Sequence, residues 1–218
     1  MNVDDAEAAQ LFDICKISHL LESKTNQLSG GEKQRIALCM LLVKYPKLLI
    51  LDEPFSNLDP IHKNILKAVL EDITGRLQIT CLLASHDPQD TLSWADEILV
   101  MKEGRVVQQG TPKEIYYQPA NEYVAGIFGK YNLLTPQQAS WFGIEAHEKE
   151  VMIRPEGFSI SATDNNGIKG TIRKISFWGN FYEAELLIKD LVFVVRTTKN
   201  EWAIGEEVFI TLPVKSAL

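Results

Sequence analysis

Several features that would place a protein in other classes are scarce or missing in this 218-residue sequence. Its three cysteines, Cys15, Cys39 and Cys81, lie far apart among apolar residues, and no C-x-x-C pair occurs. This excludes a disulfide scaffold and argues against a cysteine-ligated metal, so we expect buried thiols in a reducing compartment. No apolar run approaches the roughly 18 residues of a membrane-spanning helix, and the acidic N-terminal residues are unlike a secretory signal.

An excess of basic residues is also missing. The sequence has 22 Lys and Arg against 29 Asp and Glu, which gives a formal net charge of -7. Such a chain is a poor candidate for binding nucleic-acid phosphates or anionic membranes through bulk charge. Apolar residues (45%) and charged residues (23%) occur in ordinary globular proportions, which excludes a disordered chain and is enough for a sizeable core.

The first part of the chain alternates between helical and strand-like patterns. Apolar residues recur at helical spacing in 8–15, in 33–44 and behind Asp59-Pro60, a capping carboxylate followed by proline. Helix 33–44 is expected to bury a broad apolar face made of Ile36, Ala37, Met40 and Leu41. The continuous apolar runs 48–51 and 79–84 predict strands covered on both faces. Strands and helices in this order predict an α/β fold with a parallel sheet.

The second part changes character. A short helix is expected to begin at Asp87-Pro88, followed by a hairpin of 97–101 and 105–109 and a helix from Thr111 that closes at Gly126 and Gly129. Beyond Val151 there are only short strand-like runs, which predict a small all-β domain, an OB-like barrel or a sandwich. We therefore expect two domains, 1–134 and 135–218. The runs are VMIR, FSISA, GTIRKISF, YEAELLI, LVFVVRT and EVFITL.

Three clusters of residues carry possible chemistry. The first is Ser29-Gly30-Gly31, directly before a predicted helix. Glycines let a ligand approach the backbone, and the free N–H groups of a helix start favour phosphate, although a serine cap with a glycine turn is an equally good interpretation of this cluster alone.

The second and third clusters follow the two predicted strands. Asp52 and Glu53 end the first strand, and His86 follows the second. Ligands bind at the carboxyl ends of parallel strands, where one carboxylate can support Mg²⁺ and another can activate water. Taken singly, an acidic pair or a histidine at a strand end is also common on solvated surfaces. Asp59, between these clusters, is expected to cap its helix whatever else it does.

Taken together, LSGGEKQR (28–35), LLILDEP (48–54), SNLD (56–59) and ASHD (84–87) resemble the nucleotide-binding subunits of ABC transporters. The four segments are similar to that family's signature loop, Walker B strand, D-loop and H-loop. The stretch from Ala95 to Leu134 is similar to the end of such a domain in the importer branch. The β-rich tail, with IRPE (153–156) and FWGNFYE (177–183), resembles the small regulatory domain called TOBE.

The resemblance implies a partial P-loop-NTPase-type sheet and a set of roles. ATP and Mg²⁺ would be the cofactors. Asp52 would support Mg²⁺, Glu53 would be the general base and His86 would contact the γ-phosphate. The remaining members, Ser29, Gly30 and Gly31 of the signature loop, would touch ATP held mainly by a second subunit, and Asp59 would bridge the dimer. Glu32 stands where many members have Gln, a departure of little weight.

The resemblance also implies partners and a location. The parent would be a cytoplasmic homodimer at the inner membrane, and it would reach that membrane only through transmembrane permease subunits. No nucleic acid is expected. The transported substrate does not follow from the resemblance.

One motif of the family is missing from these residues. No G-x-x-x-x-G-K-[ST] occurs, and the nearest fragment, Gly129-Lys130-Tyr131, has neither the upstream glycine nor the hydroxyl. We therefore expect the C-terminal part of a transporter ATPase that hydrolyses no ATP alone, because the main phosphate cradle is absent. We also expect uncovered apolar surface and self-association.

Two alternatives remain open. One is a non-catalytic regulatory module in which the β-rich domain senses a ligand. The other is a fragment of a chromosome-maintenance or DNA-repair ATPase, which the acidic charge, Pro54 and the lack of long heptad runs disfavour.

Overall fold

The computed structural model describes residues 4–145, 149–163 and 166–213. The chain divides into two compact units, Met1–Trp94 (unit 1) and Ala95–Leu218 (unit 2), and each is considered by itself. The predicted division between residues 134 and 135 concerns sequence domains and stays a prediction. Among the residues that the structure describes, none of the helices has the length and apolar character that a membrane crossing requires.

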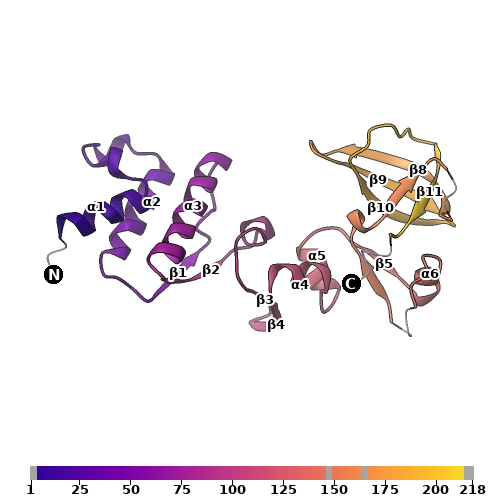
Figure 1. The fold of residues 1–218 in the computed structure, drawn as a ribbon, viewed down its shortest axis with the longest axis horizontal. Helices are drawn as coiled ribbons and strands as arrows, with labels where there is room; N and C mark the ends of the chain where they lie inside the picture. Colours follow the sequence, from indigo (N-terminus) through magenta and orange to yellow (C-terminus); the bar gives the residue numbers. More distant parts are fainter. Residues whose placement is uncertain (1–3, 146–148, 164–165, 214–218) are drawn as a thin grey trace. The chain divides into compact units, whose positions relative to one another are not determined.

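Unit 1 is a mixed α/β structure in which helices pack on one side of a short parallel sheet (Figure 1). Strands β1 (Leu48–Asp52) and β2 (Thr80–Ala84) pair in parallel, with Leu48 opposite Thr80 and Asp52 opposite Ala84. The α/β class and the parallel pairing confirm the prediction. The helices are α1 (Asp5–Ile14), α2 (Gly30–Leu42) and α3 (Pro60–Arg76), and the 3₁₀ turns are η1 (Ser18–Leu20), η2 (Thr25–Gln27) and η3 (Pro88–Asp90).

The core of unit 1 lies between the three helices and one face of the sheet. From α3 it takes Leu66, Val69, Leu70 and Ile73, which recur at helical spacing and are buried. From β1 it takes Leu49, which is buried, and Leu51, which is partly buried. Cys15 and Cys39 are buried free thiols in this core and Cys81 is partly buried, which confirms the expectation for the first two.

Two predictions about burial are wrong. Of the predicted face of the second helix, Ala37, Met40 and Leu41 are exposed and only Ile36 is partly buried against the core. The buried residues of the helix are instead Gly31, Arg35, Leu38, Cys39 and Leu42. This helix is apolar on two sides, and only one of them meets α1 and α3. The helix also begins at Gly30 rather than at residue 33, because Ser29 caps it.

The strands are covered on one face rather than on both. The outward side chains Leu48, Ile50 and Leu82 are 50%, 66% and 50% exposed, and we call these three residues the uncovered face. Alternating side chains of a strand point to opposite faces, so the apolar run is long enough for two covered faces but only one has a partner. The predicted uncovered apolar surface is therefore confirmed.

Unit 2 begins with a hairpin and two short helices. β3 (Ile98–Lys102) and β4 (Arg105–Gly110) pair antiparallel, as predicted. The helix predicted from Thr111 to Gly126 is instead two helices, α4 (Pro112–Tyr117) and α5 (Glu122–Ile127), because a turn containing Pro119 separates them. The predicted helix at Asp87-Pro88 in unit 1 is likewise only the single 3₁₀ turn η3.

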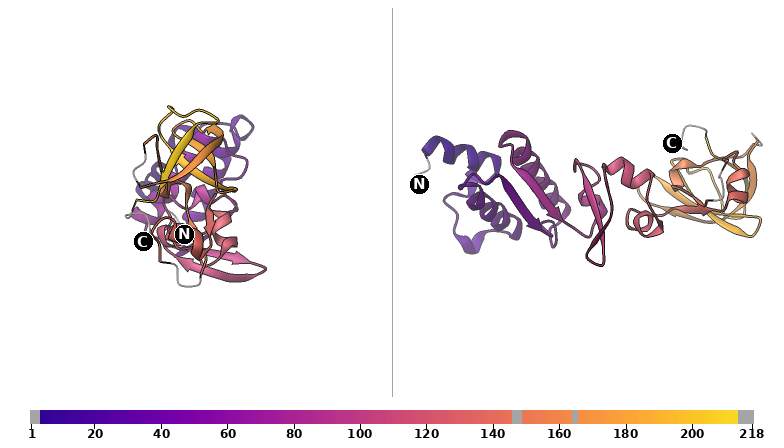
Figure 2. Two further views of the ribbon diagram at one scale, coloured as in Figure 1. Left: turned by 90° about the vertical axis from the view of Figure 1, so that its right-hand side faces the viewer. Right: turned by 90° about the horizontal axis from the view of Figure 1, so that it is seen from below.

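The rest of unit 2 is dominated by a curved antiparallel sheet in the order β10-β9-β8-β11-β7, coloured orange to yellow in Figure 2. It confirms a β-rich C-terminal part. A smaller pair, β5 with β6, lies within the same unit. The elements are β5 (Asn132–Leu134), α6 (Pro136–Ser140), β6 (Val151–Ile153), η4 (Pro155–Gly157), β7 (Ser159–Ser161), β8 (Ile168–Phe177), β9 (Tyr182–Ile188), β10 (Leu191–Thr197) and β11 (Glu207–Thr211).

Candidate functional site

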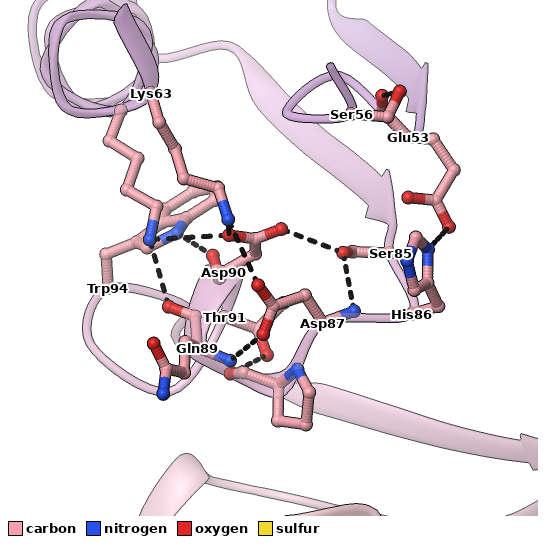
Figure 3. Close-up of polar contacts among 12 residues, drawn as sticks. Glu53, Ser56, Lys63, Ser85, His86, Asp87, Gln89, Asp90, Thr91 and Trp94 are labelled. Atoms are coloured by element: carbon pink, nitrogen blue, oxygen red, sulfur yellow. Dashed lines mark hydrogen bonds and ion pairs between the residues drawn. The ribbon is translucent and has the colours of Figure 1, made fainter. Parts of the chain in front are cut away.

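The candidate site lies where β1 and β2 end. Because the strands are parallel and Asp52 is opposite Ala84, the residues that follow them emerge at the same edge of the sheet. Glu53 Oε1 lies 2.7 Å from His86 Nδ1, so the structure brings these two predicted residues into direct contact (Figure 3). The edge therefore presents a carboxylate and an imidazole as one hydrogen-bonded pair.

The backbone at Glu53 is held in an unusual conformation. Its φ of +47° is in the left-handed region, which costs a residue with a Cβ roughly 1–2 kcal/mol. The surrounding bonds maintain it: Glu53 N–H donates to Ala84 O at 2.9 Å, and Ser56 Oγ–H donates to Glu53 O at 2.7 Å. Strain of this kind is concentrated at functional sites, where it aims a side chain.

The pair also sets the charge state of His86. The hydrogen bond from the ring to Glu53, together with the charge of that carboxylate, raises the pKa of His86 above its ordinary value. The imidazole is 81% exposed, so a ligand can reach it from solvent. The Glu53–His86 pair can therefore offer a protonated imidazole to an anionic group, or a carboxylate to a water molecule.

Asp52 lies on the outward face of β1, on the same side as Leu48 and Ile50. Its carboxylate is exposed, and no group of three His, Cys, Asp or Glu side chains suitable for a metal occurs among the described residues. Mg²⁺ usually keeps several waters and takes one or two carboxylates together with substrate phosphates. Asp52 is therefore suited to be the one carboxylate ligand of a Mg²⁺ ion that arrives with a nucleotide, while the phosphates and water would provide the other ligands.

Ser29 and the two glycines form the start of α2. Ser29 Oγ accepts a hydrogen bond from the N–H of Glu32 at 3.2 Å, and the Glu32 carboxylate accepts one from the N–H of Ser29 at 2.7 Å. This reciprocal pair is a capping box. Gly30 faces open space, with no atom within 4 Å of the position of a Cβ. The cap interpretation of Ser29 is thus correct, and the open approach at Gly30 leaves room for an anion at the helix start.

Asp59 caps α3 and is also linked to the glycines. Its Oδ1 accepts the N–H groups of Ile61 and His62 at 2.9 and 3.0 Å, and its Oδ2 lies 2.6 Å from His62 Nδ1. The ring of His62 in turn lies against Gly31, where a Cβ would be only 2.7 Å from His62 Cδ2. His62 therefore connects Gly31 at the start of α2 to Asp59 at the start of α3, a contact that was not predicted from the sequence.

A larger network beneath His86 was also missed. Asp90, whose side chain is only 4% exposed, forms ion pairs with Lys63 at 2.5 Å and Lys67 at 3.7 Å. Its other oxygen accepts the hydroxyl of Ser85 at 3.1 Å, and Ser85 Oγ accepts the N–H of Asp87 at 3.1 Å (Figure 3). A buried carboxylate needs such partners. The lysines lie at i and i+4 on one face of α3, which is the only signal that the sequence offered.

The structure does not connect all predicted residues. Within the described residues, no hydrogen bond or ion pair joins Ser29 to Glu53. The same holds for Asp52, whose side chain has no such contact with another described side chain. The site consists of two parts, a strand-end part with Glu53 and His86 and a helix-start part with Ser29, Gly30 and Gly31. The roles assigned to these residues stay predictions.

Comparisons with known proteins match both the N-terminal and the C-terminal parts of the chain. The family model described as ABC transporter matches residues 2–56, which include Ser29, Gly30, Gly31, Asp52 and Glu53, and the model described as TOBE domain matches residues 151–218. An ATP-binding cassette of an ABC transporter, solved in its ADP conformation, has 23% identity and a TM-score of 0.50 over 59% of this chain and 51% of that one. That likeness supports the fold alone.

Curated relatives cover most of the chain. The sulfate/thiosulfate import ATP-binding protein CysA of Synechocystis sp. is 33% identical over 92% of this chain and 61% of that protein. The spermidine/putrescine import ATP-binding protein PotA of Borreliella afzelii is 36% identical over 86% of this chain and 58% of that protein. The chain thus spans about three fifths of the length of these relatives. The chain therefore carries an ABC transporter match and a C-terminal TOBE domain match, and its listed relatives are ATP-binding subunits of import systems.

Proposed function

We propose that this chain supplies one side of an ATP site in an energy-coupling subunit of an import system. The single observation that carries the proposal is the Glu53–His86 contact of 2.7 Å at the carboxyl edge of a parallel strand pair. In this arrangement Glu53 orients and deprotonates the attacking water, and His86 donates its ring N–H to the terminal phosphate. Asp52 would hold Mg²⁺ that arrives with ATP, and the bound metal would supply neutralisation of phosphate charge.

The helix-start part serves a second nucleotide. Ser29, Gly30 and Gly31 present backbone N–H groups and a hydroxyl to the γ-phosphate of ATP held by another subunit, and Asp59 lies at the contact between subunits. This assigns a homodimer to the working protein. The capping box supports the role of the helix start as an anion site, because it fixes the helix start while it leaves Gly30 open.

The 218-residue chain alone is expected to hydrolyse no ATP. Phosphoryl transfer depends on donors placed around the phosphates, and the G-x-x-x-x-G-K-[ST] cradle is not among these residues. The test is a sensitive phosphate-release assay on the purified chain, with Glu53→Gln as the matched control. Turnover by the chain that Glu53→Gln abolishes would contradict the inactivity. The same assay after adding a relative's P-loop segment tests whether the chain completes a working site.

The import partners are proposed from the relatives. Two of them are named for chemically opposite cargoes, an oxyanion and a polyamine, yet both align with most of this chain. We infer that cargo is selected outside these residues, by transmembrane permease subunits, and that the chain acts at the cytoplasmic face of the inner membrane. Co-purification of the chain with a permease pair from its own operon tests this, and failure to co-purify would contradict it.

A second candidate is a regulatory module without catalysis. It is favoured by the separate core of unit 2, which includes Ile172, Leu186 and Ile188, and by the TOBE match. A thermal-shift screen of the full chain against oxyanions and polyamines tests it, since a ligand that binds only the folded state raises the melting temperature.

A further inference from the structure

We propose that Asp90, paired with Lys63 and Lys67 and bonded to Ser85, is a positioning residue that fixes the loop carrying His86 against helix α3. This proposal concerns the geometry of the strand-end part of the site. Its importance for phosphate contact rests on the proposed function, whereas the positioning itself involves no nucleotide.

The network joins three segments that the sequence keeps apart. Lys63 lies one turn after Asp59, the cap of α3, and its Nζ reaches Asp90 at 2.5 Å and Asp87 at 3.1 Å. Ser85, which directly precedes His86, donates to Asp90. The start of α3 is thereby tied to the loop that follows β2 by ion pairs and hydrogen bonds rather than by apolar packing alone.

Further contacts hold Asp90 itself. Its backbone oxygen accepts the indole N–H of Trp94, and Lys67 Nζ donates to Gln89 O at 2.9 Å. The ring of Phe55, which is buried two residues after Glu53, lies 5.5 Å from Lys67 Nζ. A cation near an aromatic face is attracted by the ring. The helix α3 and the loop after β2 therefore meet at this cluster (Figure 3), and Phe55 of the loop after β1 lies beside it.

The consequence for His86 follows from its exposure. An imidazole that is 81% exposed has little packing of its own to hold it beside Glu53. Ser85 is the neighbouring residue in the chain, and its hydroxyl is bound to both Asp90 and the N–H of Asp87. If the cluster is broken, the loop is free to move and the 2.7 Å contact with Glu53 is lost.

The test is an NMR titration of the histidine ring protons in the full chain, without nucleotide. His86 is assigned by comparison with His86→Gln. The groups that act on this imidazole are the carboxylates of Glu53, Asp87 and Asp90, all of which raise its pKa. Glu53→Gln is the positive control and must lower the pKa of His86.

Lys63→Met is the decisive variant because the loss of its charge and the loss of positioning would shift the pKa of His86 in opposite directions. Removing a nearby cation by itself would raise the pKa of His86, since the protonated ring would feel less repulsion. Loss of positioning would lower it toward the ordinary value, since Glu53 would no longer be in contact. We expect the pKa to fall in Lys63→Met and to stay raised in Lys63→Arg and in Lys44→Met, which removes an exposed lysine that has no part in the cluster.

Ser85→Ala guards against variants that fail to fold, because it removes only one hydroxyl. We expect it to lower the pKa of His86 as Lys63→Met does. A rise or no change in the pKa of His86 in both folded variants would overturn the proposal. These outcomes do not depend on ATP. Failure of the chain to complete a working site after a relative's P-loop segment is added would therefore contradict the proposed function without affecting this inference, and the reverse also holds.

Discussion

The contact between Gly31 and His62 leads to a sharp prediction about the signature loop. A Cβ at residue 31 would lie 2.7 Å from Cδ2, 3.1 Å from Cγ and 3.2 Å from Cβ of His62. The last two atoms are not the free end of a flexible chain, so the ring cannot simply swing aside. Gly31→Ala should therefore push α3 away from α2 or force the His62 ring out of its rotamer.

The expected magnitude combines two opposing effects. Overpacking of this kind costs about 1–3 kcal/mol. Replacing glycine with alanine inside a helix gains up to about 1 kcal/mol. With the full gain, the net effect of Gly31→Ala is a loss of up to about 2 kcal/mol in the free energy of unfolding of unit 1. A His62→Ala background removes the ring and leaves only the contact with Cβ at 3.2 Å, so the cost of Gly31→Ala should become smaller.

The assay is urea unfolding followed by far-ultraviolet circular dichroism, which reports mostly on the helices of unit 1. Gly30→Ala is the matched control, since a Cβ at residue 30 meets no atom within 4 Å and should be neutral or stabilising. The reasoning is refuted if Gly31→Ala is tolerated as well as Gly30→Ala. It is also refuted if His62→Ala leaves the cost of Gly31→Ala unchanged, because the two residues would then be uncoupled.

Three further predictions concern charge, surface and burial. The N–H of Ser29 lowers the pKa of Glu32, so this carboxylate contributes stability above its ordinary pKa and loses it as the pH falls through the lowered one. Unfolding of Glu32→Gln should therefore depend less on pH in acid than that of the wild type, and equal slopes would contradict this. Ile50→Lys with Leu82→Lys should change stability by no more than about 0.5 kcal/mol and should reduce self-association in light scattering; unchanged association would show that another surface is responsible. Arg154→Met should destabilise unit 2 by about 3 kcal/mol in fluorescence-monitored unfolding, because the buried guanidinium donates to four backbone oxygens, and Arg154→Lys should fail to restore the loss.

The strand-end part of the site could be predicted from the sequence because it depends on patterns of residues that are adjacent in the chain. Each strand is a short apolar run followed at once by polar residues, and parallel pairing brings the two ends to one edge. Asp52, Glu53 and His86 were found in this way. The caps at Ser29 and Asp59 are likewise local, since each side chain reaches an N–H two or three residues ahead.

The positioning network could not be predicted because its contacts are long-range. Asp90 lies 27 residues from Lys63 along the chain, and nothing in the local pattern indicates that this aspartate is buried. In the sequence, Asp90 is simply an acidic residue a few positions after His86, which is typical of a solvated loop. Only the docking of α3 beside the loop after β2 turns it into a buried partner for two lysines.

The face of α2 was predicted wrongly for a different reason. The helix carries apolar residues on two sides, so periodicity alone does not say which side is buried. The buried side contains Arg35, a residue that composition would place outside. A charged residue on the packed side and Met40 on the exposed side together reverse the expected pattern.

The same ambiguity affects the register of the strands, and the turns resolve it. Leu48, Leu49, Ile50 and Leu51 are equally apolar, so a slip of one residue would be invisible to the pattern, yet it would move Asp52 to the opposite face. Three non-glycine residues in the left-handed region fix the position instead: Tyr45 before β1, Glu53 after it, and Gln78 before β2, with φ of 46°, 47° and 54°. Because such conformations cost energy, they persist only where the surrounding structure holds them. The placement of the acidic pair therefore depends on the turns that bound the strands, and substitutions in those turns should displace Glu53 from His86 more readily than apolar substitutions within the strands.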